Sequence, residues 1–240
     1  MKIFILAHPD DEVFFLPHIV DSSQKLFIYM TNGVPEVATL AQLNRRSLEA
    51  KSIFQDLITN LNSKVVWWGL ENSISDGKLH THVNMKLIKE LHKVIMQQGV
   101  QVTQFLTTTF EGAHQDHDSA AVIARRLAAK FHVDIIEMST YPQFLKNIYS
   151  FKVLKPNSFQ KTFKFNRLKI LVVAIRLMMR YRTQWLTWLG LGVSTLSVYA
   201  FRKYRSAEPI QIQTVKPCFY EFRGRANQAD VLRNLLGIDM

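Results

Sequence analysis

Short apolar runs separated by longer amphipathic segments are the feature that most limits how this chain can fold. Five runs have the length and apolar character of buried strands, and they are Lys2–Ala7, Lys25–Met30, Lys64–Trp68, Gln104–Thr108 and Asp134–Met138. Three longer segments carry apolar residues at helical spacing, namely Gln42–Leu57, Val83–Gln97 and Ser119–Phe131. Strands that alternate with helices are joined by right-handed crossovers and form parallel sheets. We therefore expect an α/β fold with a doubly wound, mostly parallel, Rossmann-like sheet and helices on both faces.

A polar cluster follows the first predicted strand directly. It consists of His8, Pro9, Asp10, Asp11 and Glu12. In open α/β sheets ligands bind beyond the carboxyl ends of the strands, so a functional site is expected at this position. Proline suits the first turn of a helix, because its missing N–H would have no partner there. We expect a helix with Pro9 in its first turn to follow the strand.

A second polar cluster lies about a hundred residues later, after the predicted strand Gln104–Thr108. It contains His114, Gln115, Asp116 and His117. Asp118 and Ser119 are expected to begin the next helix, which places His117 just before its N-terminus. Two histidines three residues apart project from the same side of a helix, so one can bind a metal ion while the other faces a substrate.

The two clusters together contain the donors of a catalytic metal site. Zinc in proteins binds imidazole nitrogen and carboxylate oxygen, and a catalytic zinc keeps three protein ligands and one open position. His8, Asp11 and His117 are the candidate ligands. Asp10 is then free to accept a proton from water as general base, and His114 to stabilise an oxyanion or protonate a leaving amine. Two histidines and a carboxylate also suit ferrous iron, so the residues leave the metal open.

Each cluster also has a simpler interpretation. Acidic residues after a strand are common at helix N-termini, where they complement the helix macrodipole. The occurrence of both clusters, each beside a strand-like run, favours the metal site. We interpret Glu12 and Asp116 as residues that orient a metal ligand or cap a turn.

The segments 7–12 and 111–118 resemble the two signature motifs of the PIG-L/LmbE-like family of zinc-dependent N-acetylglucosaminyl deacetylases. The resemblance extends to the segments 31–33, 46–50 and 76–77 and covers about the first 140 residues. It implies the following roles: zinc ligands His8, Asp11 and His117, general base Asp10, transition-state or leaving-group histidine His114, and substrate contacts Arg46 and Asp76. Simpler interpretations are a solvated helix position for Arg46 and a plain turn at Asp76. The segment 204–208 lacks the glutamine that many members carry near the last strand.

Positive charge is concentrated in one part of the chain. Between Met138 and Ala207 there is no Asp or Glu, whereas thirteen Lys and Arg residues occur there and the net charge of the whole chain is +11. Such a segment favours an anionic partner, and its long apolar stretches favour a membrane surface over nucleic acid. We expect two amphipathic helices over 166–201, broken near Gly190–Gly192, that lie on a membrane or cover the active site. A solvated basic face and core helices of an oligomer are the alternatives.

The length and composition fit an enzyme with one large core. We expect a catalytic core over 1–145, a basic apolar helical segment over 146–205, and strands and a helix over 206–240 that complete the core. Within the last part, 210–215 and Phe219–Phe222 are expected as strands and Ala229–Leu236 as a helix. The single cysteine, Cys218, excludes an internal disulfide, and the N-terminus shows no signal peptide, so a cytoplasmic location is expected, peripheral to the membrane.

Three functions from different classes remain at this point. The resemblance implies a zinc-dependent deacetylase that removes the N-acetyl group from an N-acetylated amino sugar, within a lipid-linked or polysaccharide glycan. A metal-containing module that binds a glycan without turnover is the alternative. A nucleic-acid-binding protein is a weaker third, because the basic segment has no zinc-finger or RNA-recognition signature.

Overall fold

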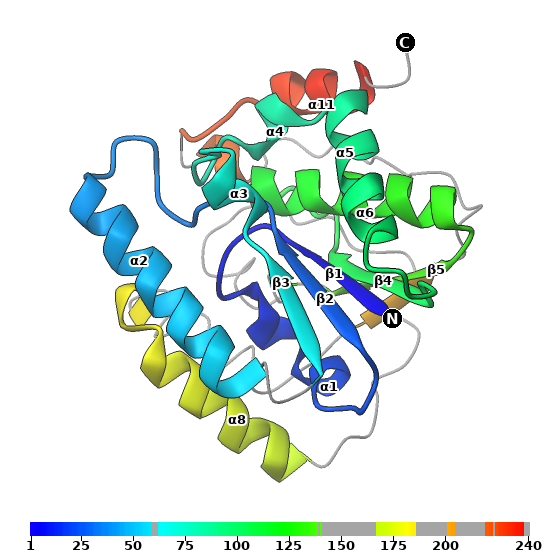
Figure 1. The fold of residues 1–240 in the computed structure, drawn as a ribbon. Helices are drawn as coiled ribbons and strands as arrows, with labels where there is room; N and C mark the ends of the chain where they lie inside the picture. Colours follow the sequence, from blue (N-terminus) through cyan, green and yellow to red (C-terminus); the bar gives the residue numbers. More distant parts are fainter. Residues whose placement is uncertain are drawn as a thin grey trace.

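The computed structural model describes residues 1–58, 62–138, 140, 167–185, 201–204, 219–222 and 224–237 of the 240-residue chain (Figure 1). Its centre is a six-stranded sheet with the order β3-β2-β1-β4-β5-β6. The strands are β1 (Lys2–Leu6), β2 (Lys25–Tyr29), β3 (Ser63–Val66), β4 (Gln104–Thr108), β5 (Asp134–Met138) and β6 (Phe201–Tyr204). The first five are mutually parallel, and β6 pairs with β5 in the antiparallel direction. The predicted α/β sheet and its five strands are therefore confirmed.

Helices cover both faces of this sheet (Figure 1). One face packs against α4 (Leu79–His82), α5 (Met85–Met96), α6 (Gln115–Phe131) and α11 (Gln228–Leu236). The other face packs against η1 (Asp11–Phe15), α1 (Leu16–Ile19), α2 (Leu40–Ile53) and α8 (Arg167–Arg180). The shorter elements are η2 (Phe54–Ile58), α3 (Trp68–Glu71), η4 (Arg182–Gln184) and α10 (Phe219–Phe222). The sheet is thus buried on both sides, which explains the nearly continuous apolar character of its strands.

The long predicted helices are present, and their ends have identifiable physical causes. Thr39 caps α2 through a reciprocal pair of hydrogen bonds with Gln42, and Asn84 caps α5 by accepting the N–H of Leu87. Four buried residues of α5, namely Leu87, Ile88, Leu91 and Ile95, form one face at helical spacing. The predicted closing helix is also present as α11.

Several local predictions were wrong. Phe219–Phe222 is a helical turn, not a strand; Glu221 accepts the N–H of Gln228 and so ties this turn to the start of α11. The strand β6 lies inside the segment that we expected to be helical, where it covers the edge of β5. Pro9 lies before η1, which begins only at Asp11. The expected strand over 210–215 and the expected break near Gly190 lie outside the described residues.

The part of 166–201 that the structure describes contains one predicted amphipathic helix. It is α8, whose Ala174 and Leu177 are buried in the core, while Val172, Ile175 and Met179 are exposed. Within the residues that the structure describes, no helix is long and apolar enough to cross a bilayer.

Candidate active site

The first polar cluster lies in a closed turn between β1 and η1. The backbone N–H of His8 donates to Oδ2 of Asp11 at 2.8 Å, and the N–H of Asp11 donates to the carbonyl of His8 at 3.2 Å. Asp10, between them, has a φ of 151°, which side-chain-bearing residues rarely adopt. Such a conformation costs about 1–3 kcal/mol and is found mainly at functional sites. The turn therefore holds the backbone of Asp10 in a strained conformation and fixes the position of its carboxyl group.

The second polar cluster forms the start of α6. β4 runs parallel to β1 as its neighbour, so the loops at their carboxyl ends meet. The side chain of His114 caps α6 by accepting the N–H of Asp116, so the helix begins at Gln115 and His117 lies inside its first turn. The predicted start at Asp118 was wrong because histidine is not among the usual capping residues. Asp118 instead accepts the N–H groups of Glu111 and Gly112 and fixes the preceding loop.

The three predicted metal ligands form one donor set. Ligand atoms of His8, Asp11 and His117 all lie within 4.8 Å of one another. Nε2 of His117 is 3.2 Å from Oδ1 of Asp11, and Nδ1 of His8 is 3.7 Å from Oδ2 of the same carboxylate. Burial acts to raise the pKa of Asp11, but the two imidazoles hold it well below its usual range, so the carboxylate is ionised. The structure thus brings together an anionic oxygen donor and two nitrogen donors.

The ring of His117 is oriented for metal binding by Thr140. The Thr140 hydroxyl donates to Oε1 of Glu111 at 2.7 Å, and its oxygen is 3.2 Å from Nδ1 of His117. Since a hydroxyl has only one proton, Thr140 accepts the Nδ1–H of His117. Nε2 of His117 therefore carries the lone pair that a metal ion requires.

A second donor set shares His8 with the first. It consists of His8, Asp76, His114 and Asp116, again with ligand atoms within 4.8 Å of one another. Oδ1 of Asp76 lies 3.3 Å from Nε2 of His8 and 3.4 Å from Nε2 of His114. Asp76 was predicted to contact substrate, and the structure places it directly beside both histidines.

Asp116 holds the turn that carries Asp76. Its carboxylate accepts the backbone N–H groups of Gly77 at 2.5 Å and Leu79 at 3.0 Å. Oδ2 also lies 3.2 Å from Nε2 of His8. Gly77 has a φ of +86°, which a residue with a side chain adopts only with strain. Asp116 therefore joins the start of α6, the 76–79 turn and His8.

The donor chemistry of this centre fits zinc. Zinc binds histidine nitrogen and carboxylate oxygen, and its histidine ligands usually bond a second group through the other ring nitrogen. Thr140 is that group for His117, and the carboxylates of Asp76 and Asp116 face Nε2 of His8. His8, Asp11 and His117 would hold the ion, as the sequence predicts.

Arg46 is buried beside the predicted general base. Nη2 of Arg46 is 3.0 Å from Oδ2 of Asp10, and the guanidinium also donates to the carbonyl of Pro9. Gly33 is required here because an added Cβ would lie 2.8 Å from Pro9 Cδ and 3.1 Å from Arg46 Nε. Burial raises the pKa of Asp10 above its ordinary value, while the charge of Arg46 opposes that rise. Arg46 is not the solvated helix position that the simpler interpretation proposed.

Glu12 lies below the site, on the core side. Its carboxyl accepts hydrogen bonds from the hydroxyls of Tyr29, at 2.9 Å, and Tyr181. Burial raises the pKa of Glu12 to about 7. Tyr181 also lies under the Arg46 guanidinium, whose Cζ is 5.1 Å from the ring centroid. Glu12 thus connects the end of α8 to the first cluster.

Several residues around the site carried no recognisable signal in the sequence. Thr140 orients His117, Arg225 has Nη1 at 3.0 Å from Nε2 of His114, and Thr183 accepts from Arg46 at 3.2 Å. None of them belongs to a local motif with ligand spacing. Glu111 was noticed only as part of the 111–118 resemblance, although its carboxylate binds Thr140.

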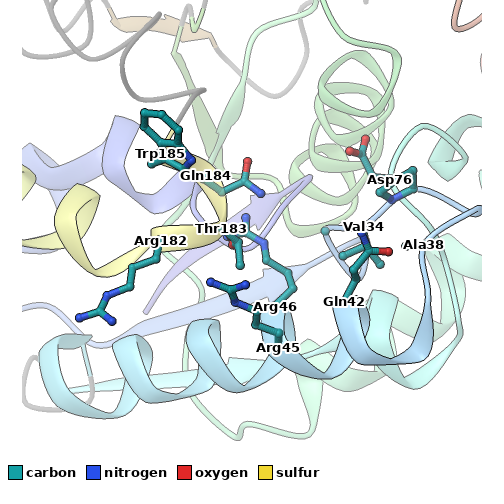
Figure 2. A pocket seen from close by; sticks show the side chains of 12 residues that line it. Val34, Ala38, Gln42, Arg45, Arg46, Asp76, Arg182, Thr183, Gln184 and Trp185 are labelled. Atoms are coloured by element: carbon teal, nitrogen blue, oxygen red, sulfur yellow. The ribbon is translucent and has the colours of Figure 1, made fainter.

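A cavity of about 400 Å³ opens beside the donor sets (Figure 2). Gly33, Arg46 and Asp76 form the part of its wall that belongs to the candidate active site. Arg182 and Trp185, next to the end of α8, form the opposite part. Its volume is in the range of small-molecule sites.

Comparisons with known proteins identify a family for this chain and agree with its fold. A family model described as PIG-L, GlcNAc-PI de-N-acetylase, matches residues 3–128, which is more than half of the chain. A search of curated proteins gave no match.

Solved structures of deacetylases share the fold. The zinc-inhibited form of teicoplanin deacetylase Orf2 superposes with a TM-score of 0.60 at 13% identity, covering 87% of this chain and 100% of that one. The A40926 pseudoaglycone deacetylase Dbv21 gives 0.55 at 13% identity, covering 87% and 98%. N,N'-diacetylchitobiose deacetylase from Pyrococcus horikoshii gives 0.51 at 17% identity, covering 85% and 84%. At such identities the likeness concerns the fold, whereas the family is shown by the match over 3–128. The chain belongs to the PIG-L/LmbE-like deacetylase family.

Proposed function

We propose that this protein is a zinc-dependent deacetylase that hydrolyses the N-acetyl group of an N-acetylated amino sugar and releases acetate. The observation that carries the proposal is the donor set of His8, Asp11 and His117 next to the strained, buried Asp10. Membership of a family described by a GlcNAc-PI de-N-acetylase supports an acetylated amino sugar as substrate. Solved structures with the same fold are named as deacetylases of teicoplanin and of N,N'-diacetylchitobiose, which supports deacetylation as the reaction.

Each residue of the site has a separate role in the proposed reaction. His8, Asp11 and His117 would hold a metal ion, which would supply Lewis-acid chemistry and lower the pKa of water. Asp10 accepts a proton as water attacks the acetyl carbonyl carbon. His114, whose ring centroid lies 4.8 Å from that of His8 and 5.3 Å from that of His117, stabilises negative charge on the carbonyl oxygen. When the C–N bond breaks, the nitrogen receives the proton that Asp10 accepted from water. The products are acetate and a free sugar amine.

We also propose contact with an anionic membrane surface. It is supported by exposed apolar residues of α8, namely Val172, Ile175 and Met179, and by the basic composition of 146–205. A liposome sedimentation assay with and without anionic lipid tests it. Equal amounts of pelleted protein in the two cases would contradict it.

Acetate release tests the enzymatic proposal directly. The zinc-loaded protein is incubated with N-acetylglucosamine, its phosphates and N,N'-diacetylchitobiose, and acetate and free amine are measured. We expect stoichiometric release that stops after chelation and returns after zinc is added. Sugar binding with zinc present but without acetate release would favour the glycan-binding module instead.

A further inference from the structure

Two arginines in the cavity have charges that no described residue neutralises. Arg45, on α2, and Arg182, the first residue of η4, both line the cavity and are exposed, and neither forms an ion pair with any described residue. Arg46, by contrast, is bound to Asp10 and Glu49. Asp76, the acidic residue of the wall, lies against His8 and His114. The unneutralised charge of the cavity is therefore positive.

The segment that carries Arg182 is fixed in place. Thr183 donates its backbone N–H to Oε1 of Glu49 at 3.1 Å, and its hydroxyl bonds the other oxygen of the same carboxylate. The same hydroxyl accepts Nη1 of Arg46 at 3.2 Å. A site whose wall is held before binding loses less entropy when a ligand enters.

Trp185 and two amide side chains complete the cavity wall. Trp185 is 58% exposed, an unusual state for the largest apolar side chain. Gln42 and Gln184 add amide groups that donate and accept hydrogen bonds. Figure 2 shows Arg182 at the opposite end from Asp76, with Arg45, Arg46 and Gln42 along α2. Such a wall suits a ligand with one anionic group and one flat or apolar part.

We propose that this cavity is a subsite for a phosphate group carried by the acetylated substrate, bound by Arg45 and Arg182. The proposal rests on the proposed function, because Asp76 joins the cavity to the candidate catalytic centre. Arginine binds phosphate through two parallel N–H donors, and two arginines from different elements bind it from two sides. Trp185 covers the part of the substrate beyond the phosphate. Arg182 and Trp185 lie outside the segment 3–128 that the family model matches, whereas Arg45 lies within it.

Competing substrates test the proposal. With the zinc-loaded protein, we measure kcat/KM for N-acetylglucosamine 1-phosphate, for N-acetylglucosamine 6-phosphate and for N-acetylglucosamine. The value for each phosphate is then divided by the value for N-acetylglucosamine. We expect the better phosphate to be preferred by at least about tenfold, and Arg45→Gln or Arg182→Gln to lower this ratio by roughly tenfold. Arg233→Gln, which removes an exposed arginine of α11 that pairs with Asp230, is the matched control and leaves the ratio unchanged.

A binding assay separates this proposal from the proposed function. The protein is treated with a chelator, so that no metal competes for phosphate, and titrated by calorimetry with the sugar phosphates, N-acetylglucosamine and inorganic phosphate. We expect a sugar phosphate to bind tightest and Arg182→Gln to weaken it by roughly tenfold. Such binding, together with no acetate release by the zinc-loaded protein, would refute the deacetylase and keep the subsite. Equal affinity for N-acetylglucosamine, or for inorganic phosphate, would refute the subsite whatever the turnover.

Discussion

The guanidinium of Arg46 lies 3.0 Å from Asp10, and the arginine is only 2% exposed. From this geometry we expect Arg46 to position Asp10, the proposed general base. We expect Arg46→Met to lower kcat by about 10²-fold with little change in KM, because a misplaced catalytic group costs about that much. Arg46→Lys keeps the charge but loses the two-pronged geometry and should give an intermediate kcat. Steady-state kinetics checks this; a raised KM at unchanged kcat would show substrate contact instead.

Asp10 is assigned to proton transfer and not to metal binding. Asp10→Asn is therefore expected to keep one zinc per chain and to lower kcat by about 10²–10⁴-fold, the usual contribution of a general base. Metal content is measured by atomic emission on the same samples that are assayed for acetate. Normal turnover of this variant would remove Asp10 from the mechanism, and lost zinc would make it a ligand.

Thr140 fixes the ring of His117 through its hydroxyl oxygen. Thr140→Val has nearly the same shape but cannot accept the Nδ1–H of His117, so we expect zinc affinity to fall by about 10–100-fold. Thr140→Ser keeps the hydroxyl and serves as the control. Competition with a coloured chelator measures both affinities, and equal affinities of the valine variant and the unmodified protein would show that His117 needs no such partner.

Gly69 of α3 packs directly on the backbone of Thr31, which follows the end of β2. A Cβ added there would lie 2.2 Å from Cα of Thr31, a distance that only backbone movement can relieve. We expect Gly69→Ala to lower the free energy of unfolding by about 3 kcal/mol or more. Gly237→Ala, whose Cβ would have no neighbour within 4 Å, should change it by less than about 0.5 kcal/mol. Urea unfolding compares the two variants, and similar losses would contradict the packing argument.

We expect His18 to make the stability of the protein depend on pH. Burial lowers the pKa of His18 to about 4, with a further contribution from the charge of Lys2. The unfolded chain, where histidine has its ordinary pKa of about 6.5, therefore binds more protons between pH 6.5 and 4. The free energy of unfolding should therefore decrease as the pH is lowered from 6.5 to 4, by up to about 1.4 kcal/mol for each pH unit.

His18→Gln is expected to flatten that dependence. The free energy of unfolding is measured in urea between pH 7 and 4.5, with chelator present so that metal release does not contribute. His82→Gln, at an exposed position of α4, is the control and should keep the original slope. Parallel curves for the His18 variant and the unmodified protein would show that another group controls the slope.

The strands and the two polar clusters follow from the sequence because their signals are local. Runs such as Lys25–Tyr29 are buried on both faces of the sheet, so most of their residues are apolar. The helix α5 is recognisable from the 3.6-residue spacing of its buried face. The short elements had no such period: α10 and β6 are each four residues long, and tertiary contacts determine their conformation.

The sheet, the order of its helices and the residues that could bind a metal can be predicted from local sequence patterns. Three contacts cannot be predicted in this way and become visible only in the folded chain: Arg46 against Asp10, Thr140 against His117, and Asp116 against the turn of Gly77. These contacts join residues at least 23 positions apart. The physical reason is that periodicity reports how a segment is buried, whereas contacts between loops depend on where parallel strands end side by side.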